Sequence, residues 1–279
     1  MIGFFNINKP SGVSSAQVVA KIKHMCPKAT KVGHMGTLDP MASGVLPIAV
    51  GRATRLFDLM QNKQKEYIAT FKFGYSTNTL DATGEIVEKT NVLPSAKEIE
   101  AVLPSFVGEI EQIPPSFSAK NVEGTRAYKL ARNGKQVVLK SCKVKIFDIQ
   151  LLKELKKDEF VFKIVCGSGT YIRSLCRDIA SKLGTLATMT ALIRTKTGNF
   201  DIGAAKNFAC ITAKDIVPID EVFDYPKITL MGDELTTLLQ GKKVCFSQQN
   251  GMFFGIYDNK IQLVLKIKNG ICVDKIWLR

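Results

Sequence analysis

The chain has 279 residues, 46% of them hydrophobic and 23% charged, and its formal net charge is +14 at pH 7. This length suits one large domain, or a domain with a small module, and the composition is neither that of a disordered chain nor that of a membrane protein. The longest weakly polar stretch, residues 44–50, contains Pro47 and is too short to cross a bilayer. The N-terminus has only a brief apolar run with no basic residue before it, so no secretory signal peptide is expected.

The cysteines and histidines argue against a structural metal. The seven cysteines are spread singly along the chain, no CxxC pair occurs, and neither His24 nor His34 lies near a pair of cysteines. Such a pattern is typical of reduced thiols in a cytoplasmic protein and not of a zinc site. No cluster of carboxylates stands out in the sequence either, so we expect no metal ligands.

The positive charge is concentrated, which indicates a polyanionic partner. Residues 120–145 contain eight basic residues and one acid, Glu123, so this segment carries half of the net charge. A protein that uses lysine only for solubility would intersperse its signs, and an acidic membrane surface would require a long basic amphipathic helix, which is lacking here. We therefore expect a nucleic acid as the partner and no membrane. The basic residues are Lys120, Arg126, Lys129, Arg132, Lys135, Lys140, Lys143 and Lys145.

Helical spacing and capping patterns predict the helices. Ser14 with Gln17, and Ser95 with Glu98, have the spacing of capping boxes, so a helix is expected to start at each serine. A continuous apolar stripe that stops at Gly184 predicts the clearest helix of the chain. The expected helices are 14–26, a short one at about 54–60, one that opens at 95, and 170–184.

Alternating or continuous apolar residues between turn residues predict the strands. Strands and helices do not alternate regularly, so the expected fold class is α+β: a mixed, mostly antiparallel sheet with flanking helices over residues 1–225. After Tyr225 and Pro226 the pattern changes to short strands, which predicts a small β-rich module over 226–279 that is marginal without its neighbour. The expected strands are 44–51, 65–74 and 159–167, followed in the module by 242–248, 251–257, 260–267 and 272–279.

Four residues stand out, although each also has an ordinary structural interpretation. Asp39 carries the only charge in VGHMGTLDPMASGVLP, residues 32–47, but an Asp before a proline is also a common turn initiator. His34 is equally typical of a loop, and Tyr67 of a core aromatic with its hydroxyl at the rim. Arg173 lies in the first turn of its helix, where the helix dipole disfavours a cation, so it has either a carboxylate partner or an exposed side chain. Position alone does not decide between these two.

Together, these residues and their motifs resemble the bacterial tRNA pseudouridine-55 synthases of the TruB family from end to end. NKPSGVSS at 8–15 is similar to the family's opening KP-x-G-x-x-S, and GHMGTLDPMASGVLP at 33–47 to its loop G-H-x-G-x-L-D-P-x-A-x-G-x-L-P. The long loop motif is highly specific, and the further motifs follow in the family's order. These are KEY at 65–67, QIPPSFSA at 112–119 with GTRAYKLARNG at 124–134, GTYIRSLCRDI at 169–179 and TALIRTKTGNF at 190–200.

The resemblance implies the site residues. It makes Asp39 the catalytic residue, Arg173 its partner and Tyr67 the active-site tyrosine. It also implies that Leu192 lines the base pocket. His34, in a glycine-flanked loop beside Asp39, is expected to fill the gap left in the RNA. Further substrate contacts are expected from Lys9 in the opening motif and from Lys129 and Arg132 in an RNA-gripping insertion at about 112–145.

The resemblance also implies a pseudouridine synthase fold, with residues 226–279 as a short PUA-like RNA-binding module near the acceptor stem of tRNA. The chain departs from the family pattern at three places. Met35 replaces a small polar residue, Ile193 with Arg194 replaces a basic pair, and Asn121 replaces a lysine. These positions bear on RNA contacts and therefore on affinity, not on the reaction.

The implied reaction breaks the N1–C1′ bond of uridine, turns the base and joins C5 to C1′. Nothing is oxidised and no group is imported, so no cofactor is expected. One ionised carboxylate is sufficient if an arginine holds it, and Asp39 has three routes open: attack at C1′, addition at C6, or removal of the 2′ proton to give a glycal. The target uridine in the T loop must be flipped out of its stack, and Tyr67 is expected to stack on it. We expect a monomer that binds the T arm.

Two other functions remain open. A guide-RNA-dependent pseudouridine synthase subunit of the archaeal and eukaryotic kind shares the chemistry but largely lacks the basic insertion, so the insertion favours a stand-alone enzyme. A non-catalytic RNA-binding or tRNA-folding protein would not need Asp39, Tyr67 and Arg173 together, although a tRNA-folding activity is compatible with them.

Overall fold

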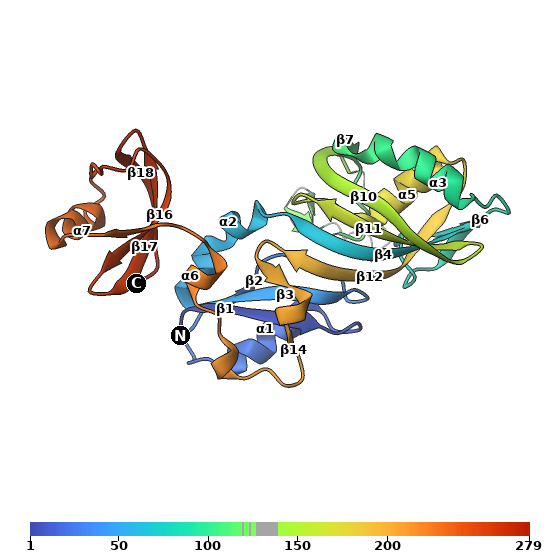
Figure 1. Ribbon diagram of the computed structural model, residues 1–279. Helices are drawn as coiled ribbons and strands as arrows, with labels where there is room; N and C mark the ends of the chain where they lie inside the picture. Colours follow the sequence, from blue (N-terminus) through green and yellow to red (C-terminus); the bar gives the residue numbers. More distant parts are fainter. Residues whose placement is uncertain (119, 123, 127–138) are drawn as a thin grey trace.

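The computed structural model describes residues 1–118, 120–122, 124–126 and 139–279 (Figure 1). Lys129 and Arg132, which were expected to contact RNA, lie outside this described part. Two sheets account for most of the described strands. Those of the main sheet are β1 (Gly3–Lys9), β2 (Val32–His34), β3 (Ser43–Val50), β4 (Lys65–Phe73), β7 (Gly108–Gln112), β10 (Cys142–Lys156), β11 (Glu159–Cys166), β12 (Ala187–Thr197), β13 (Phe200–Asp201) and β14 (Lys206–Asn207).

The main sheet runs in the order β14-β1-β3-β12-β4-β11-β10-β7, with β13 beside β12 and β2 beside β3. Its pairs are antiparallel except for β1 with β14 and β12 with β3, which are parallel. The predicted mixed, mostly antiparallel sheet is therefore confirmed. Two small hairpins lie apart from it, β5 (Tyr75–Thr77) with β6 (Ile86–Lys89) and β8 (Asn121–Val122) with β9 (Thr125–Arg126).

The helices begin where the capping patterns predict. Both capping boxes form, Ser14 with Gln17 and Ser95 with Glu98. The first helix ends at His24, with Met25 as its C-cap, and is therefore shorter than the predicted helix 14–26. The helices are α1 (Ser15–His24), α2 (Phe57–Gln61), α3 (Ala96–Val102), α5 (Ile172–Lys182), α6 (Ile219–Val222) and α7 (Gly232–Leu239), with 3-10 turns η1 (Gly51–Leu56), η2 (Leu103–Phe106), η3 (Ile202–Ala204) and η4 (Ala213–Asp215).

The main core lies between the sheet and its helices. Along β4 every second residue is buried, as the alternation predicted, and the apolar stripe of α5 packs into the same cluster. Phe71 stacks obliquely on Phe162 of the neighbouring strand, with ring centroids 4.6 Å apart. In Figure 1, α1 lies beside β1 and β14, and α3 and α5 lie toward β7, β10 and β11. The sheet thus holds Tyr67 and the start of α5 close together.

The C-terminal part forms a second sheet, in the order β15 (Lys227–Thr229), β16 (Asn250–Tyr257), β17 (Lys260–Lys268) and β18 (Ile271–Trp277). The strand predicted at 242–248 is wrong. Val244 is buried there, but the stretch makes only an isolated bridge from Cys245 to Ile271 and no continuous ladder. The sequence pattern also gave no sign of α7, in which Leu235 and Leu238 contribute to the module's core at helical spacing.

A buried cluster joins the two sheets. It contains Phe4 and Met35 from the first part of the chain, Phe223 from the connection, and Phe254 and Leu278 from the second sheet. Figure 1 shows the smaller sheet at one end of the molecule, attached through α6. The module therefore rests on apolar contacts with its neighbour, as expected for so short a segment.

The basic insertion emerges from the edge of the main sheet. Gln112 at the end of β7 pairs with Cys142 at the start of β10, so the chain between them leaves and rejoins adjacent antiparallel strands. The root of the insertion is bound to α5, because the Ser174 hydroxyl donates to the carbonyl of Ile113 at 2.8 Å. The described part of the insertion thus starts beside the helix that carries Arg173.

Candidate active site

Asp39 lies in the loop that joins β2 to β3, and the NKPSGVSS segment holds this loop. The hydroxyl of Ser15 accepts the N–H of Leu38 at 3.0 Å and donates to the carbonyl of Leu38 at 2.9 Å. The N–H of Gly12 donates to the carbonyl of Pro40 at 2.8 Å. Both neighbours of Asp39 are therefore fixed by the same segment, which explains why the two motifs occur together.

Arg194 supports the loop from inside the protein. Its side chain is only 1% exposed, and it donates to three carbonyls: from Nε to Val45 at 2.7 Å, from Nη1 to Thr37 at 3.3 Å and from Nη2 to Gly36 at 3.2 Å. The backbone of β12 passes so close to Gly44 that a Cβ there would collide with the carbonyl of Arg194. Of the basic pair that the family pattern has at 193 and 194, this chain keeps only Arg194. Its guanidinium holds the Asp39 loop by hydrogen bonds.

Lys9, which was expected to contact the RNA, lies inside the protein. Its side chain is fully buried, and Nζ donates to the carbonyls of Pro10 at 2.8 Å, Val13 at 2.6 Å and Pro40 at 3.2 Å. All three ammonium protons are used inside the protein, so in this structure Lys9 positions the Asp39 loop and does not present its charge to RNA. Burial lowers the pKa of Lys9 to about 8, against the opposing effect of Asp39.

Asp39 and Arg173 form the pair that the sequence pointed to. Nη2 of Arg173 lies 2.9 Å from Oδ2 of Asp39, and the arginine side chain is 6% exposed whereas that of the aspartate is 33% exposed. Of the two interpretations of a helix-start arginine, the buried and partnered one is correct. The exposed face of the carboxylate is left for a ligand, while the guanidinium holds its other side.

Arg173 also binds a second carboxylate, which the sequence did not indicate. Nη1 lies 3.5 Å from Oδ2 of Asp81, and the guanidinium donates to the carbonyls of Thr79 at 3.0 Å and Phe117 at 3.1 Å. Four partners from three separate segments thus fix the arginine. Phe117 belongs to the insertion, so the insertion is tied directly to the arginine that orients Asp39.

Asp81 is itself held in place. Its side chain is 6% exposed, and Oδ1 accepts the Thr79 hydroxyl at 2.8 Å, the Thr83 N–H at 3.0 Å and the Thr83 hydroxyl at 2.5 Å. The sequence TNTLDATG does contain a signal, since threonines that flank an aspartate are typical of a turn closed by its carboxylate. It gives no sign, however, that the other carboxylate oxygen meets an arginine about ninety positions later.

A cavity of about 800 Å³ opens over these residues, a volume in the range of small-molecule sites. Asp39, Tyr67, Arg173 and Leu192 all line it, so the structure brings these four expected residues together. Tyr67 is 6% exposed, and burial raises the pKa of its phenol, which is therefore protonated at neutral pH.

Lys65 also lines the cavity and was not expected there. Its Nζ donates to the carbonyls of Gln61 and Lys63, at 3.2 and 3.1 Å, and burial lowers its pKa to about 8. The charged residues of the wall are two buried arginines, this lysine, Asp39 and Asp81, so the cations outnumber the carboxylates by one. Such a wall suits a ligand that offers oxygen acceptors.

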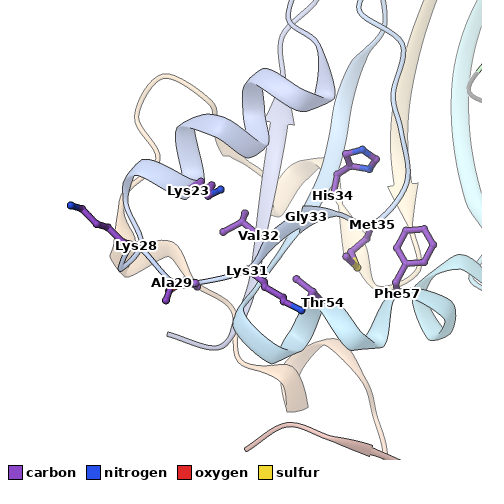
Figure 2. Close-up of a pocket in the computed structure, with 11 residues that line it drawn as sticks. Lys23, Lys28, Ala29, Lys31, Val32, Gly33, His34, Met35, Thr54 and Phe57 are labelled. Carbon is purple, nitrogen blue, oxygen red and sulfur yellow. The ribbon is translucent and has the colours of Figure 1, made fainter. Parts of the chain in front are cut away.

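His34 does not line this cavity. It lies on β2 and lines a neighbouring surface pocket of about 510 Å³, shown in Figure 2. Its Nδ1 is buried and has no hydrogen-bond partner among the described residues. Burial, followed by the charge of Arg194, lowers the pKa of His34, so the ring is uncharged at neutral pH. The two sites are adjacent in the chain, because Met35 lines the pocket and Gly36 lines the cavity.

Among the described residues, no three His, Cys, Asp or Glu side chains are grouped in a way that could hold a metal ion. No described helix is long and apolar enough to cross a membrane. All seven cysteines are free.

Comparison with protein families decides the relationship. The model described as "TruB family pseudouridylate synthase (N terminal domain)" matches residues 23–172, which is more than half of the chain. The chain belongs to the TruB family. A second model, "tRNA pseudouridylate synthase B C-terminal domain", matches residues 173–223. The resemblance seen in the motifs is therefore confirmed, and the TruB models cover both Asp39 and Arg173.

Individual TruB relatives are similar over most of their length. The tRNA pseudouridine synthase B of Clostridium kluyveri is 42% identical, over 86% of this chain and 84% of its own. That of Caldanaerobacter subterraneus subsp. tengcongensis is 37% identical, over 92% and 91%. Among solved structures, a Cbf5-Nop10-Gar1 complex aligns with a TM-score of 0.68 at 25% identity, over 96% of this chain and 79% of the other. The structure of an H/ACA RNP bound to a substrate RNA containing 2'-deoxyuridine aligns with a TM-score of 0.69 at 23% identity, over 99% and 85%. These likenesses confirm the fold class of the TruB chain.

Proposed function

We propose that the chain converts uridine 55 in the T loop of tRNA to pseudouridine, with Asp39 as the catalytic carboxylate. The observation that carries this proposal is the position of Asp39: ion-paired to a buried arginine on one side and open to a cavity of about 800 Å³ on the other. The family and the names of the relatives support tRNA as the substrate.

In the proposed reaction the uridine leaves its stack and enters the cavity, where Tyr67 stacks on the base and Leu192 contacts it. The N1–C1′ bond breaks, the base turns, and C5 joins C1′. The C5 proton leaves and N1 gains a proton, so the composition of the RNA is unchanged. Asp39 acts by one of three routes: attack at C1′, addition at C6, or removal of the 2′ proton.

The protonation state of Tyr67 limits its role in this chemistry. Because burial raises its pKa, the phenol enters the reaction protonated. It can therefore accept the C5 proton only if it passes its own proton to a second group in the same step. Stacking by its ring does not depend on this proton. A loss of the hydroxyl should thus affect a late step more than the detachment of the base.

The proposed RNA path extends beyond the cavity. The insertion at about 112–145 closes over the T arm, and its root is bound to Arg173 through the carbonyl of Phe117. The uncharged ring of His34 fills the space that the flipped base leaves in the loop. The C-terminal module acts as a PUA-like contact near the acceptor stem, and the protein works as a monomer in the cytoplasm.

A guide-RNA-dependent subunit is the closest alternative, since solved structures of such assemblies share the fold. Two observations favour the stand-alone enzyme. Eight relatives with 36–46% identity are each named tRNA pseudouridine synthase B, and the chain has a basic insertion between β7 and β10. A purely non-catalytic RNA-binding protein would have no need for an oriented carboxylate in a cavity.

The test is to incubate an unmodified tRNA transcript with the pure protein in the presence of EDTA and map pseudouridine chemically at single-nucleotide resolution. We expect one modified position, uridine 55, without any added guide RNA. Product that forms only with added guide RNA would favour the alternative, and absence of product with tight tRNA binding would favour a non-catalytic role.

A further inference from the structure

We infer that the pocket in Figure 2 is a second RNA subsite, which holds the backbone of the substrate next to the flipped nucleotide. The inference rests on the proposed function, because it takes tRNA as the ligand. The pocket has a volume of about 510 Å³ and lies between the end of α1, strand β2 and the start of α2. Three lysines belong to its wall: Lys23, Lys28 and Lys31.

The charge of the pocket is unopposed. None of the residues that line it is acidic, and the first acid in the whole sequence is Asp39 itself. Lys23, Lys28 and Lys31 are exposed, and no carboxylate of the described residues forms a salt bridge with any of them. Lys23 in the last turn of α1 also stabilises the helix end, but Lys28 and Lys31 lie in the connection to β2 and have no such role. A concave patch of this kind attracts phosphates.

The opposite end of the pocket is apolar. Phe57, the first residue of α2, is 39% exposed although it is a large aromatic. In Figure 2, Lys23 and Lys28 lie at one end of the pocket and Phe57 lies at the other, with β2 between them. A pocket with lysines at one end and an exposed aromatic ring at the other suits single-stranded nucleic acid, in which phosphates meet the cations and a base stacks on the ring.

The pocket is also next to the catalytic cavity along the chain. Residues 32–35 line the pocket and residues 36–41 line the cavity, so one uninterrupted stretch of chain forms a wall of both. His34 lies at their junction, and its buried Nδ1 lacks a partner among the described residues. A strand whose flipped base enters the cavity can therefore continue over His34 into the pocket. The ligand of the pocket is therefore the substrate RNA itself and not a separate anion.

The test compares two variants with the same change in net charge. The pocket variant is Lys23→Glu with Lys28→Glu and Lys31→Glu, and the control is Lys97→Glu with Lys153→Glu and Lys157→Glu, which are exposed lysines far from the pocket in the sequence and outside both linings. The affinity for unmodified tRNA is measured over a series of salt concentrations, and the bound RNA is mapped by hydroxyl-radical footprinting. Melting temperatures verify that all variants are folded.

We expect the pocket variant to bind tRNA at least about tenfold more weakly at low salt, with the slope of log K against log salt reduced by about 0.7 to 0.9 for each phosphate that the variant no longer neutralises. One protected stretch of the footprint should disappear. The control should keep the wild-type slope and footprint. Phe57→Leu, which keeps the apolar volume without the ring, should weaken binding by about fivefold or more with an unchanged salt slope.

Equal weakening of the pocket and control variants would overturn the inference, because only net charge would then matter. Wild-type affinity, slope and footprint in the pocket variant would overturn it as well. The proposed function is judged separately, by pseudouridine formation in the wild-type protein. A wild type that binds tRNA without modifying it would refute the proposed activity, while the comparison of the two variants would still decide the subsite.

Discussion

Nη2 of Arg173 lies 2.9 Å from Oδ2 of Asp39, and this pair connects the first turn of α5 to the loop between β2 and β3. An arginine at a helix start is unfavourable with respect to the helix dipole. The structure offsets this cost with two carboxylates and two carbonyls. The guanidinium thus fixes the direction of Asp39, the more exposed of the two carboxylates that line the cavity.

Asp39→Asn should abolish pseudouridine formation while tRNA binding stays within about tenfold of wild type. The amide keeps the shape of the side chain but removes the negative charge, which the chemistry needs and an RNA ligand does not. Single-turnover product formation and filter binding measure the two effects. Asp58→Asn, at an exposed carboxylate of α2, is the matched control and should remain active. Appreciable turnover by Asp39→Asn would remove Asp39 from the catalytic role.

Arg173→Lys should lower turnover by about a hundredfold or more, because a single ammonium cannot reach four partners that a planar fork reaches together. The loss of buried hydrogen bonds should also cost about 1–3 kcal/mol of unfolding free energy. Turnover and urea unfolding are the measurements. Arg177→Lys, one turn along the same helix and partnered by Asp178, should change both much less. Wild-type turnover in Arg173→Lys would show that the pair is not needed.

Asp81→Asn should lower the rate of the chemical step by about ten- to hundredfold, with little change in tRNA affinity. The amide can still accept from Thr79 and Thr83, but it no longer holds Arg173 by charge, so Asp39 becomes less well oriented. Single-turnover rates at saturating tRNA give the measurement, with Asp178→Asn on α5 as the control. If the two variants had the same rate as wild type, Asp81 would be a structural turn residue only.

Tyr67→Phe should keep stacking and lose the hydroxyl, so the reaction should stall after the base is detached. The expected result is normal tRNA binding with slow release of tritium from tRNA that carries the label at C5 of uridine. Tyr67→Leu, which loses the ring as well, should bind the flipped base poorly and separate stacking from proton transfer. Normal tritium release by Tyr67→Phe would exclude the hydroxyl from C5 deprotonation.

The buried lysines predict how stability depends on pH. Burial lowers the pKa of Lys65 from 10.5 to about 8, so between these values the unfolded chain binds a proton that the folded one has released. The contribution of Lys65 to the free energy of unfolding therefore rises with pH across that window, by about 1.4 kcal/mol per pH unit. Urea unfolding at a series of pH values measures the slope of the free energy of unfolding against pH. This slope should be smaller by that amount in Lys65→Met than in wild type. Lys97→Met, on the exposed side of α3, should retain the wild-type slope.

How far the sequence predicts the site depends on how far apart the partners lie. Local patterns were sufficient for the capping boxes of Ser14 and Ser95 and for the alternation around Tyr67, because neighbours in the chain decide them. The pairing of Asp39 with Arg173 followed from an arginine in an unfavourable position together with the family motifs. Asp81 was missed because its burial depends on a distant helix. Lys9 was assigned to RNA from its place in the opening motif, whereas its carbonyl partners become visible only in the folded loop.

The C-terminal module shows the same limit. Its longer strands follow from alternating residues, but the stretch around Cys245 satisfies the pattern of a strand without completing a ladder. The short helix α7 was overlooked because eight residues give little periodicity to detect. Secondary structure was thus least predictable where tertiary contacts, and not local preference, decide it.

Phe4 and Met35, from the part of the chain that forms the main sheet, share one buried cluster with Phe254 and Leu278 of the C-terminal module. Neither part can open without exposing apolar side chains of the other, so the two should melt in a single cooperative transition. Met35 stands between His34 and Gly36 in the loop region that leads to Asp39. Any RNA contact that stabilises the folded module therefore also suppresses local opening of this loop. The module thus contributes to the rigidity of the loop that carries Asp39.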